Sequence, residues 1–168
     1  MKTNKAFTLL ELLIYIGMAA ILLSIVAVIG INILLSKARL AAIDEVSYNG
    51  RYALDKISDL ISNASGVTAP VLGASSSSLT LSTAVSSTNP TIVNVSGGLI
   101  YVKLGSATAQ PIISTEVSST ALTFTNLGIT GDPAAVRTQL TLQYNNTSNR
   151  AEYNVSEAFA TTANIRTQ

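Results

Sequence analysis

A single acidic residue precedes a long apolar run near the N-terminus, and this junction limits how the chain can fold. Glu11 is followed by 24 residues without a charge, residues 12–35. As a helix with a rise of about 1.5 Å per residue, this run is about 36 Å long, enough to cross a hydrocarbon core of about 30 Å. A charged side chain at the membrane centre costs about 2.5–3.5 kcal/mol on insertion scales. Glu11 therefore needs either a partner charge or a position at the membrane interface.

An apolar stripe continues the helical pattern beyond the uncharged run. Apolar and small residues recur at helical spacing, with charged residues on the flanks of the stripe. The members of the stripe are Leu40, Ile43, Val46, Gly50, Ala53, Leu54, Ile57, Leu60, Ile61 and Ala64. Asn63 and Pro70 predict that the helix ends at about residue 63. We expect the stripe to pack on a sheet, and Arg51, Asp55 and Asp59 to form a solvated face.

The remainder, residues 65–168, has the composition of a β domain. It is rich in Ser, Thr, Asn, Val and Ala, and no charged residue occurs between Asp59 and Lys103. Residues 74–90 resemble a low-complexity linker, although Leu79 and Leu81 alternate as in a strand. Further strands are expected at residues 91–96, 99–104, 119–127, 137–144 and 152–160, with Gly97-Gly98 as a hairpin turn and Asp132-Pro133 capping a helical turn. The predicted fold class is α+β, one antiparallel sheet of about five to seven strands on a long helix.

The composition argues against an enzyme. The chain has no cysteine and no histidine, so thiol chemistry and the commonest general base are both missing. Asp132, Glu152 and Glu157 are isolated, so we predict no calcium or other metal site and no cofactor. Without residues 1–6 the chain would have 8 basic and 9 acidic residues. This near-neutral balance does not favour nucleic-acid binding, which needs clustered Lys and Arg.

The residues of the N-terminal segment leave several interpretations open. A plain signal anchor fits its length. A secretory signal peptide cut after Ala38 has a small-x-small site, but its apolar region should be about 7–15 residues long. Basic residues flank both ends of the run, Lys2 and Lys5 before it and Lys37 and Arg39 after it, so the positive-inside rule does not assign an orientation.

Residues 6–13, Ala-Phe-Thr-Leu-Leu-Glu-Leu-Leu, resemble the processing site of bacterial type IV pilins and type II secretion pseudopilins. The resemblance implies cleavage between Ala6 and Phe7 on the cytoplasmic side, N-methylation of Phe7, and retention of Glu11 in the membrane. One residue departs from the family pattern, because Ala6 stands where the family usually has glycine. Residues 49–58 and 153–166 also resemble larger minor pilins and J-type minor pseudopilins, although only weakly.

The resemblance implies a pilin-like architecture with four parts. Residues 1–6 are a cleaved leader, residues 7–36 the membrane and filament-core half of the helix, residues 37–64 its amphipathic half, and residues 65–168 an extracytoplasmic β domain. Cleavage would also create a positive α-amine on Phe7. Our hypothesis is that Glu11 pairs with this amine on a neighbouring chain and so sets the register of assembly.

The expected function is a structural subunit of a type IV pilus or pilus-like filament. The implied partners are other pilins, a prepilin peptidase, and an assembly platform with its ATPase. The implied location is the inner membrane for the precursor, with a cytoplasmic N-terminus, and then a cell-surface or periplasm-spanning filament. A minor pseudopilin of a type II secretion system, and a membrane-anchored extracytoplasmic binding module that never polymerises, remain the alternatives.

Overall fold

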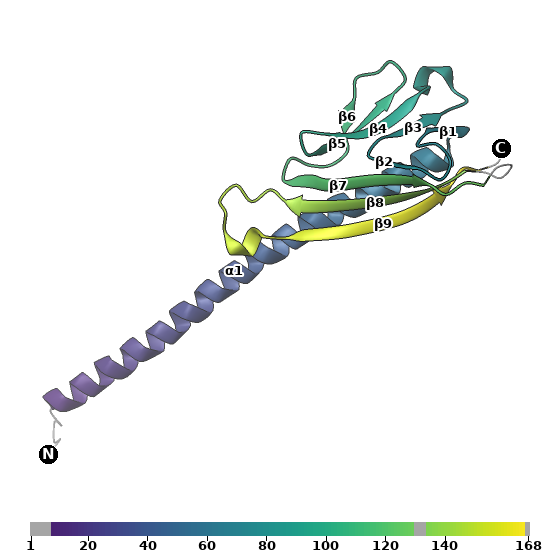
Figure 1. Cartoon of the computed structure of the whole chain (residues 1–168). Helices are drawn as coiled ribbons and strands as arrows, with labels where there is room; N and C mark the ends of the chain where they lie inside the picture. Colours follow the sequence, from purple (N-terminus) through teal and green to yellow (C-terminus); the bar gives the residue numbers. More distant parts are fainter. Residues whose placement is uncertain (1–7, 130–133, 167–168) are drawn as a thin grey trace. The chain divides into compact units, whose positions relative to one another are not determined.

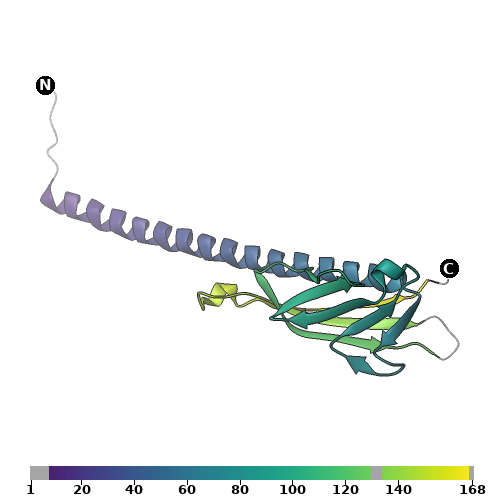
Figure 2. The same ribbon diagram turned by 90° about the horizontal axis from the view of Figure 1, so that it is seen from above.

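A computed structural model describes residues 8–129 and 134–166, and the chain divides into two compact units, Met1–Ala38 and Arg39–Gln168. The helix α1 (Leu9–Ser62) contributes its first part to the N-terminal unit and its second part to the C-terminal unit. Figures 1 and 2 show, from two directions, the helix in purple to blue and the strands that follow it in the chain in blue-green to yellow. The two units are described separately below.

The boundaries of α1 follow from residues at its two ends. No proline occurs within the helix, and Gly17 and Gly30 lie inside it without a break. At its C-terminus the Asn63 side-chain amide donates to the carbonyl oxygen of Asp59 at 2.9 Å, which satisfies one of the last carbonyls of the helix. The predicted end at about residue 63 is confirmed.

The stretch of α1 within the C-terminal unit buries one face. Val46, Ala53, Ile57 and Ile61 are fully buried there, at spacings of four or seven residues. The predicted stripe was wrong at its N-terminal end, because Leu40 is 58% exposed. Ala42 and Asn49, which the predicted stripe did not include, are buried at that end together with the predicted Gly50.

The β region forms two antiparallel sheets, so the prediction of one sheet was wrong. In the described part of the chain one sheet has five strands in the order β1-β3-β4-β5-β6, and the other has four in the order β2-β7-β8-β9. The first sheet contains β1 (Gly66–Ala69), β3 (Leu79–Ser82), β4 (Thr91–Ser96), β5 (Leu99–Leu104) and β6 (Gln110–Pro111). The second contains β2 (Ser75–Ser76), β7 (Val117–Asn126), β8 (Ala135–Tyr144) and β9 (Ser156–Asn164).

The hairpin between β4 and β5 is confirmed at its predicted position. Ser96 pairs with Leu99, and the two turn residues Gly97 and Gly98 have φ angles of 57° and 80°. This left-handed pair is what a two-residue hairpin turn requires, and glycine adopts it without a steric penalty. The carbonyl oxygen of Gly98 accepts a hydrogen bond from the Ser119 N–H at 2.7 Å, which links the turn to β7 of the other sheet.

Two other expectations need correction. The expected linker at residues 74–90 contains β2, β3 and a 3₁₀ turn, η1 (Ser86–Thr88), and it places Leu79 and Leu81 in the core. The last strand starts later and ends later than expected, because a second 3₁₀ turn, η2 (Ala151–Tyr153), precedes β9. The turn expected at Asp132-Pro133 lies outside the described residues.

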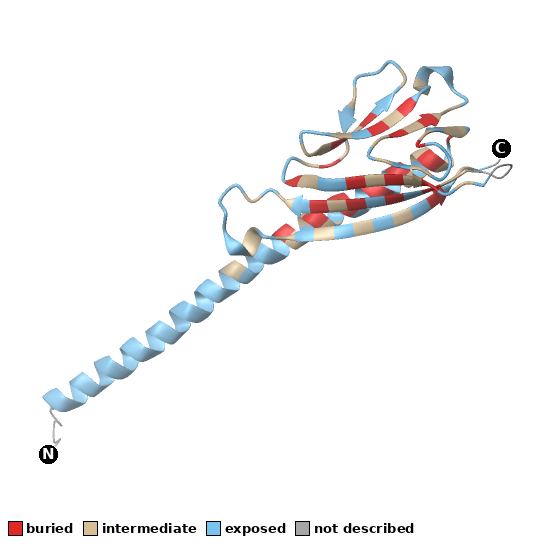
Figure 3. Cartoon of the chain, in the orientation of Figure 1, coloured by how far each residue is buried: buried red, intermediate tan, exposed pale blue. Residues whose placement is uncertain are grey.

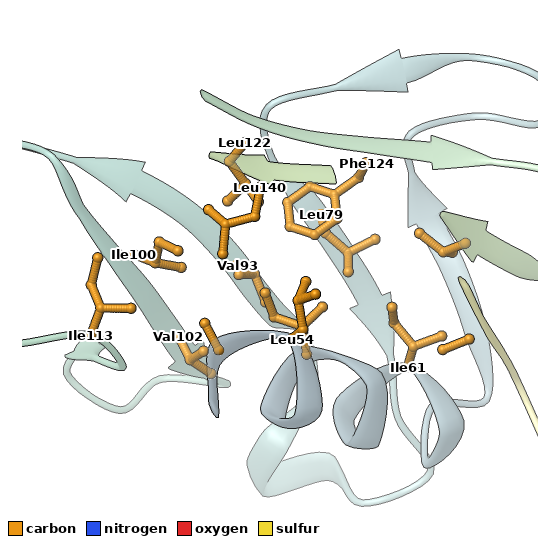
Figure 4. Close-up of a cluster of buried hydrophobic side chains, with 14 of the residues drawn as sticks. Leu54, Ile61, Leu79, Val93, Ile100, Val102, Ile113, Leu122, Phe124 and Leu140 are labelled. Atoms are coloured by element: carbon orange, nitrogen blue, oxygen red, sulfur yellow. The ribbon is translucent and has the colours of Figure 1, made fainter. Parts of the chain in front are cut away.

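The core of the C-terminal unit lies between the buried face of α1 and the two sheets. Figure 4 shows Leu54 and Ile61 of the helix beneath Leu79, Val93 and other strand side chains. Alternate residues of the strands supply these side chains, as a pleated strand requires. The fold is thus α+β and pilin-like, with one long N-terminal helix packed against antiparallel sheets.

Candidate assembly site

The first turn of α1 is organised around Thr8 and Glu11. The backbone N–H of Glu11 donates to the Thr8 hydroxyl at 3.2 Å, and the N–H of Leu12 donates to the Thr8 carbonyl oxygen at 3.2 Å. Thr8 therefore caps the helix and satisfies N–H groups that have no partner inside it. A carboxylate in the first turn also interacts favourably with the helix dipole. Glu11 thus has a local role that favours the start of the helix at this point.

Sequence reasoning missed this capping role. The signal was present, because Thr8 and Glu11 have the Ser/Thr-x-x-Glu spacing of a capping box before an apolar run. The two other predicted site residues, Ala6 and Phe7, lie outside the described residues. The structure therefore places Glu11 in the capped first turn of α1.

The helix beyond Glu11 presents apolar side chains in every direction. Within the N-terminal unit, large apolar residues from Leu9 to Leu34 are between 51% and 79% exposed. Figure 3 shows this part of α1 in the colour of exposed residues around its whole circumference. A helix that is apolar on all sides requires lipid or other helices around it. By length and composition, α1 is a candidate membrane-spanning helix.

Small and polar residues interrupt this apolar surface. A Cβ atom added at Gly17 or Gly30 would meet no atom within 4 Å, so neither glycine is required for packing inside the chain. The Ser24 hydroxyl donates to the Ala20 carbonyl oxygen at 2.7 Å and is satisfied within the helix. Small residues on a membrane helix allow a second helix to approach closely. This surface can therefore accept neighbouring helices.

Several charged and aromatic side chains of the C-terminal unit lie on its surface. Arg51, Asp55 and Asp59 are exposed, as a solvated face requires. Among the described residues Arg150 and Glu152 form an ion pair, and no group of three acidic side chains could hold a metal ion. Two tyrosines of α1 stack with ring centroids 6.4 Å apart on the exposed surface. These are Tyr48 and Tyr52, 69% and 49% exposed, and so not core residues.

A polar network joins α1 to the β region at the start of the C-terminal unit. Asn49 is 4% exposed and donates its amide to the Glu45 carboxylate at 2.8 Å. The same carboxylate accepts the Ser114 hydroxyl at 2.9 Å. Nearby, the Ser47 hydroxyl donates to the Glu157 carboxylate at 2.7 Å. These contacts attach the helix to β9 and to the loop before β7, so the network has a structural role.

Comparison with known proteins identifies the N-terminal segment. The prokaryotic N-terminal methylation motif matches residues 1–27, which include the predicted cleavage site, Glu11 and much of the apolar run. No curated protein and no solved structure matches the chain. Residues 1–27 thus carry the prepilin-type signature of type IV pilins and pseudopilins.

Proposed function

We propose that this protein is a structural subunit of a type IV pilus or pilus-like filament and that it polymerises through its N-terminal helix. The observation that carries the proposal is the match of residues 1–27 to the N-terminal methylation motif, on a helix whose large apolar residues are exposed from Leu9 to Leu34. A prepilin peptidase cuts between Ala6 and Phe7, and Phe7 is then methylated.

The charge pair explains why Glu11 is retained in this segment. After cleavage, Phe7 carries a positive amine four residues before Glu11 in the sequence. An unpaired ion in a low-dielectric environment loses its hydration, whereas two opposite charges that lie together compensate each other. In our proposal, Glu11 of an incoming subunit pairs with the amine of a neighbour, which selects one axial step between subunits.

The four parts of the chain then have separate tasks. Residues 1–6 are the leader, residues 7–36 form the membrane and filament-core helix, residues 37–64 form the amphipathic helix, and residues 65–168 form the extracytoplasmic domain. The division of the structure into Met1–Ala38 and Arg39–Gln168 supports a boundary close to residue 37.

The membrane precursor has its N-terminus in the cytoplasm, and an inner-membrane platform with its ATPase transfers it to the filament. The subunits around it are other copies or related pilins. The Asn32 amide supports helix-to-helix assembly, because it is an exposed polar side chain within the apolar run. A polar side chain in lipid is satisfied by a neighbouring helix.

Mass spectrometry of the protein purified from its own cells tests this proposal. The expected N-terminal peptide begins with N-methylated Phe7, and Ala6→Gly is expected to give the same peptide at an equal or faster rate. A protein that retains Met1 is a signal anchor, and one that begins at Arg39 is a secreted domain; either result would overturn the proposal. Electron microscopy of sheared surface material separates a filament subunit from an anchored module that does not polymerise.

A further inference from the structure

The strand β9 is a long, unpaired sheet edge. Figure 1 shows it in yellow as the outermost strand of its sheet, and in the described part of the chain it pairs with β8 alone. The other sheet edges are short, because β1 has four residues and β2 and β6 have two each. At nine residues, β9 is the one edge of the described sheets that offers a full-length template for another strand.

The phase of the β8–β9 ladder shows which backbone groups face outward. The Tyr144 N–H donates to the Val155 carbonyl oxygen at 2.9 Å, and the Ile165 N–H donates to the Ala134 carbonyl oxygen at 3.0 Å. In an antiparallel pair, the residues that exchange hydrogen bonds alternate along each strand. The odd-numbered residues of β9 therefore bond to β8. The residues with outward backbone groups are Ser156, Ala158, Ala160, Thr162 and Asn164.

This edge has few of the features that normally prevent edge pairing. Soluble proteins protect their edges with lysine, proline, inward-pointing charges or bulges. β9 has no proline and no lysine, and its register with β8 runs without a shift. Its one charged residue, Glu157, accepts a hydrogen bond from Ser47 of α1. The residues with outward backbone groups have small, neutral side chains, so a second strand can approach them without charge repulsion or steric overlap.

We propose that β9 pairs with β9 of a second copy of this chain, antiparallel and about a two-fold axis at Ala160. Among the described strands of a second copy, β9 is the free sheet edge whose length matches, so we expect β9 to be the partner. A two-fold contact is self-complementary, with the same residues on both sides. Each outward-facing residue then contributes one N–H donor and one carbonyl acceptor to a sheet that continues through both copies.

The register centred on Ala160 is also chemically compatible. It places Ala158 opposite Thr162 and Ser156 opposite Asn164, which are small or polar pairs. It places Glu157 opposite Ala163 and so keeps the two glutamates apart. Like charges directly opposite each other would be destabilising.

This contact does not depend on the proposed function. A two-fold contact closes on itself and reverses the direction of one chain, so it cannot propagate a polar filament. It joins two subunits that run in opposite directions, as in two adjacent antiparallel filaments.

Single-cysteine cross-linking of the full-length protein in detergent micelles tests the contact, because the natural chain has no cysteine. In a hydrogen-bonded antiparallel pair the Cα atoms are about 5.5 Å apart, within the range of about 4.4–6.8 Å that a disulfide spans. Ala160→Cys is expected to form a disulfide dimer about tenfold faster than Thr162→Cys or the exposed loop variant Ser106→Cys, whose thiols meet only by diffusion.

A second variant separates backbone pairing from chance collision. Ala158→Pro removes an outward N–H that β8 does not use, and proline is tolerated on the open side of an edge strand. In the Ala160→Cys background it is expected to reduce dimer formation to the level of Ser106→Cys, with an unchanged circular dichroism spectrum. The proposal would be overturned by an Ala160→Cys rate equal to that of Ser106→Cys, or by a rate that Ala158→Pro leaves unchanged in a folded protein.

Discussion

The backbone N–H of Ser114 donates to the Asn49 side-chain oxygen at 2.8 Å and joins α1 to the loop before β7 across 65 residues of sequence. The Asn49 amide donates in turn to the carbonyl oxygen and the carboxylate of Glu45. The side chain is 4% exposed, so each of these groups depends on the others for its hydrogen bonds.

Asn49→Ala is expected to lower the free energy of unfolding by about 1–3 kcal/mol, because it leaves the Ser114 N–H without its acceptor. Asn63 provides a matched control. It makes the same two local bonds, to the carbonyl oxygen and carboxylate of Asp59, but it is exposed and has no distant partner in the part of the chain that the structure describes. Asn63→Ala should cost less than about 0.5 kcal/mol in urea unfolding. Equal effects of the two substitutions would show that the link to Ser114 adds nothing.

Gly50→Leu is expected to destabilise the C-terminal unit by about 1–3 kcal/mol, as overpacking of a filled site does. A Cβ atom at Gly50 would overlap the ring of Phe159, so the glycine allows β9 to pack closely on α1. Thermal unfolding measures the loss, and Phe159→Ala in the same chain should restore part of it by removing the overlap. Additive losses in the double variant would contradict this explanation.

Two buried threonines should respond in opposite directions to replacement by valine. The Thr138 hydroxyl is fully buried and has no hydrogen-bond partner among the described residues, whereas the equally buried Thr91 hydroxyl donates to the Thr88 carbonyl oxygen at 2.9 Å. Removal of an unsatisfied hydroxyl avoids a desolvation cost, so Thr138→Val should raise the free energy of unfolding by about 1 kcal/mol. Thr91→Val should lower it by about 0.5–1.5 kcal/mol. Urea unfolding of both variants measures these changes. A lower free energy of unfolding for Thr138→Val would contradict the conclusion that its hydroxyl is unsatisfied.

Tyr144 should make stability depend on pH in the alkaline range. Partial burial first, and then the nearby Glu116 carboxylate, raise the pKa of the Tyr144 phenol above its ordinary value. The folded state therefore holds this proton at a pH where the unfolded state has lost it. The resulting contribution to the free energy of unfolding is fully present below about pH 10, and it is lost as the pH rises through the folded-state pKa of Tyr144.

Difference spectra at the tyrosinate band, native protein minus Tyr144→Phe, should show a phenol that titrates later than free tyrosine. Glu116→Gln should move this titration to lower pH, because it removes the charge that opposes ionisation. A Tyr144 titration at the ordinary value, or one that Glu116→Gln leaves unchanged, would contradict the assignment.

Local patterns predicted much of this fold, while contacts between distant residues limited the prediction. The end of α1, the Gly97-Gly98 hairpin and the alternation of Leu79 and Leu81 were all predictable, because helix termination, turn conformation and strand period depend on neighbouring residues. The division of the strands between two sheets depends on pairings such as Ser75 with Thr125, which local patterns do not specify.

The candidate site shows the same limit. The apolar run and Glu11 could be recognised, and the Thr8–Glu11 cap could have been found from its spacing. The role of Asn49 could not, because its acceptor function requires Ser114 to lie beside it in the fold.

The central claim is that Glu11 directs assembly through the Phe7 amine of a neighbouring subunit. Its most direct test is the amount of filament in sheared surface material from cells that express Glu11→Ala, compared with the amount of processed protein in their membranes. We expect the membrane level and the methylated Phe7 N-terminus to match those of the natural protein, and the filament yield to fall by about tenfold or more, since tenfold corresponds to the loss of 1.4 kcal/mol. A normal filament yield from Glu11→Ala would contradict the account.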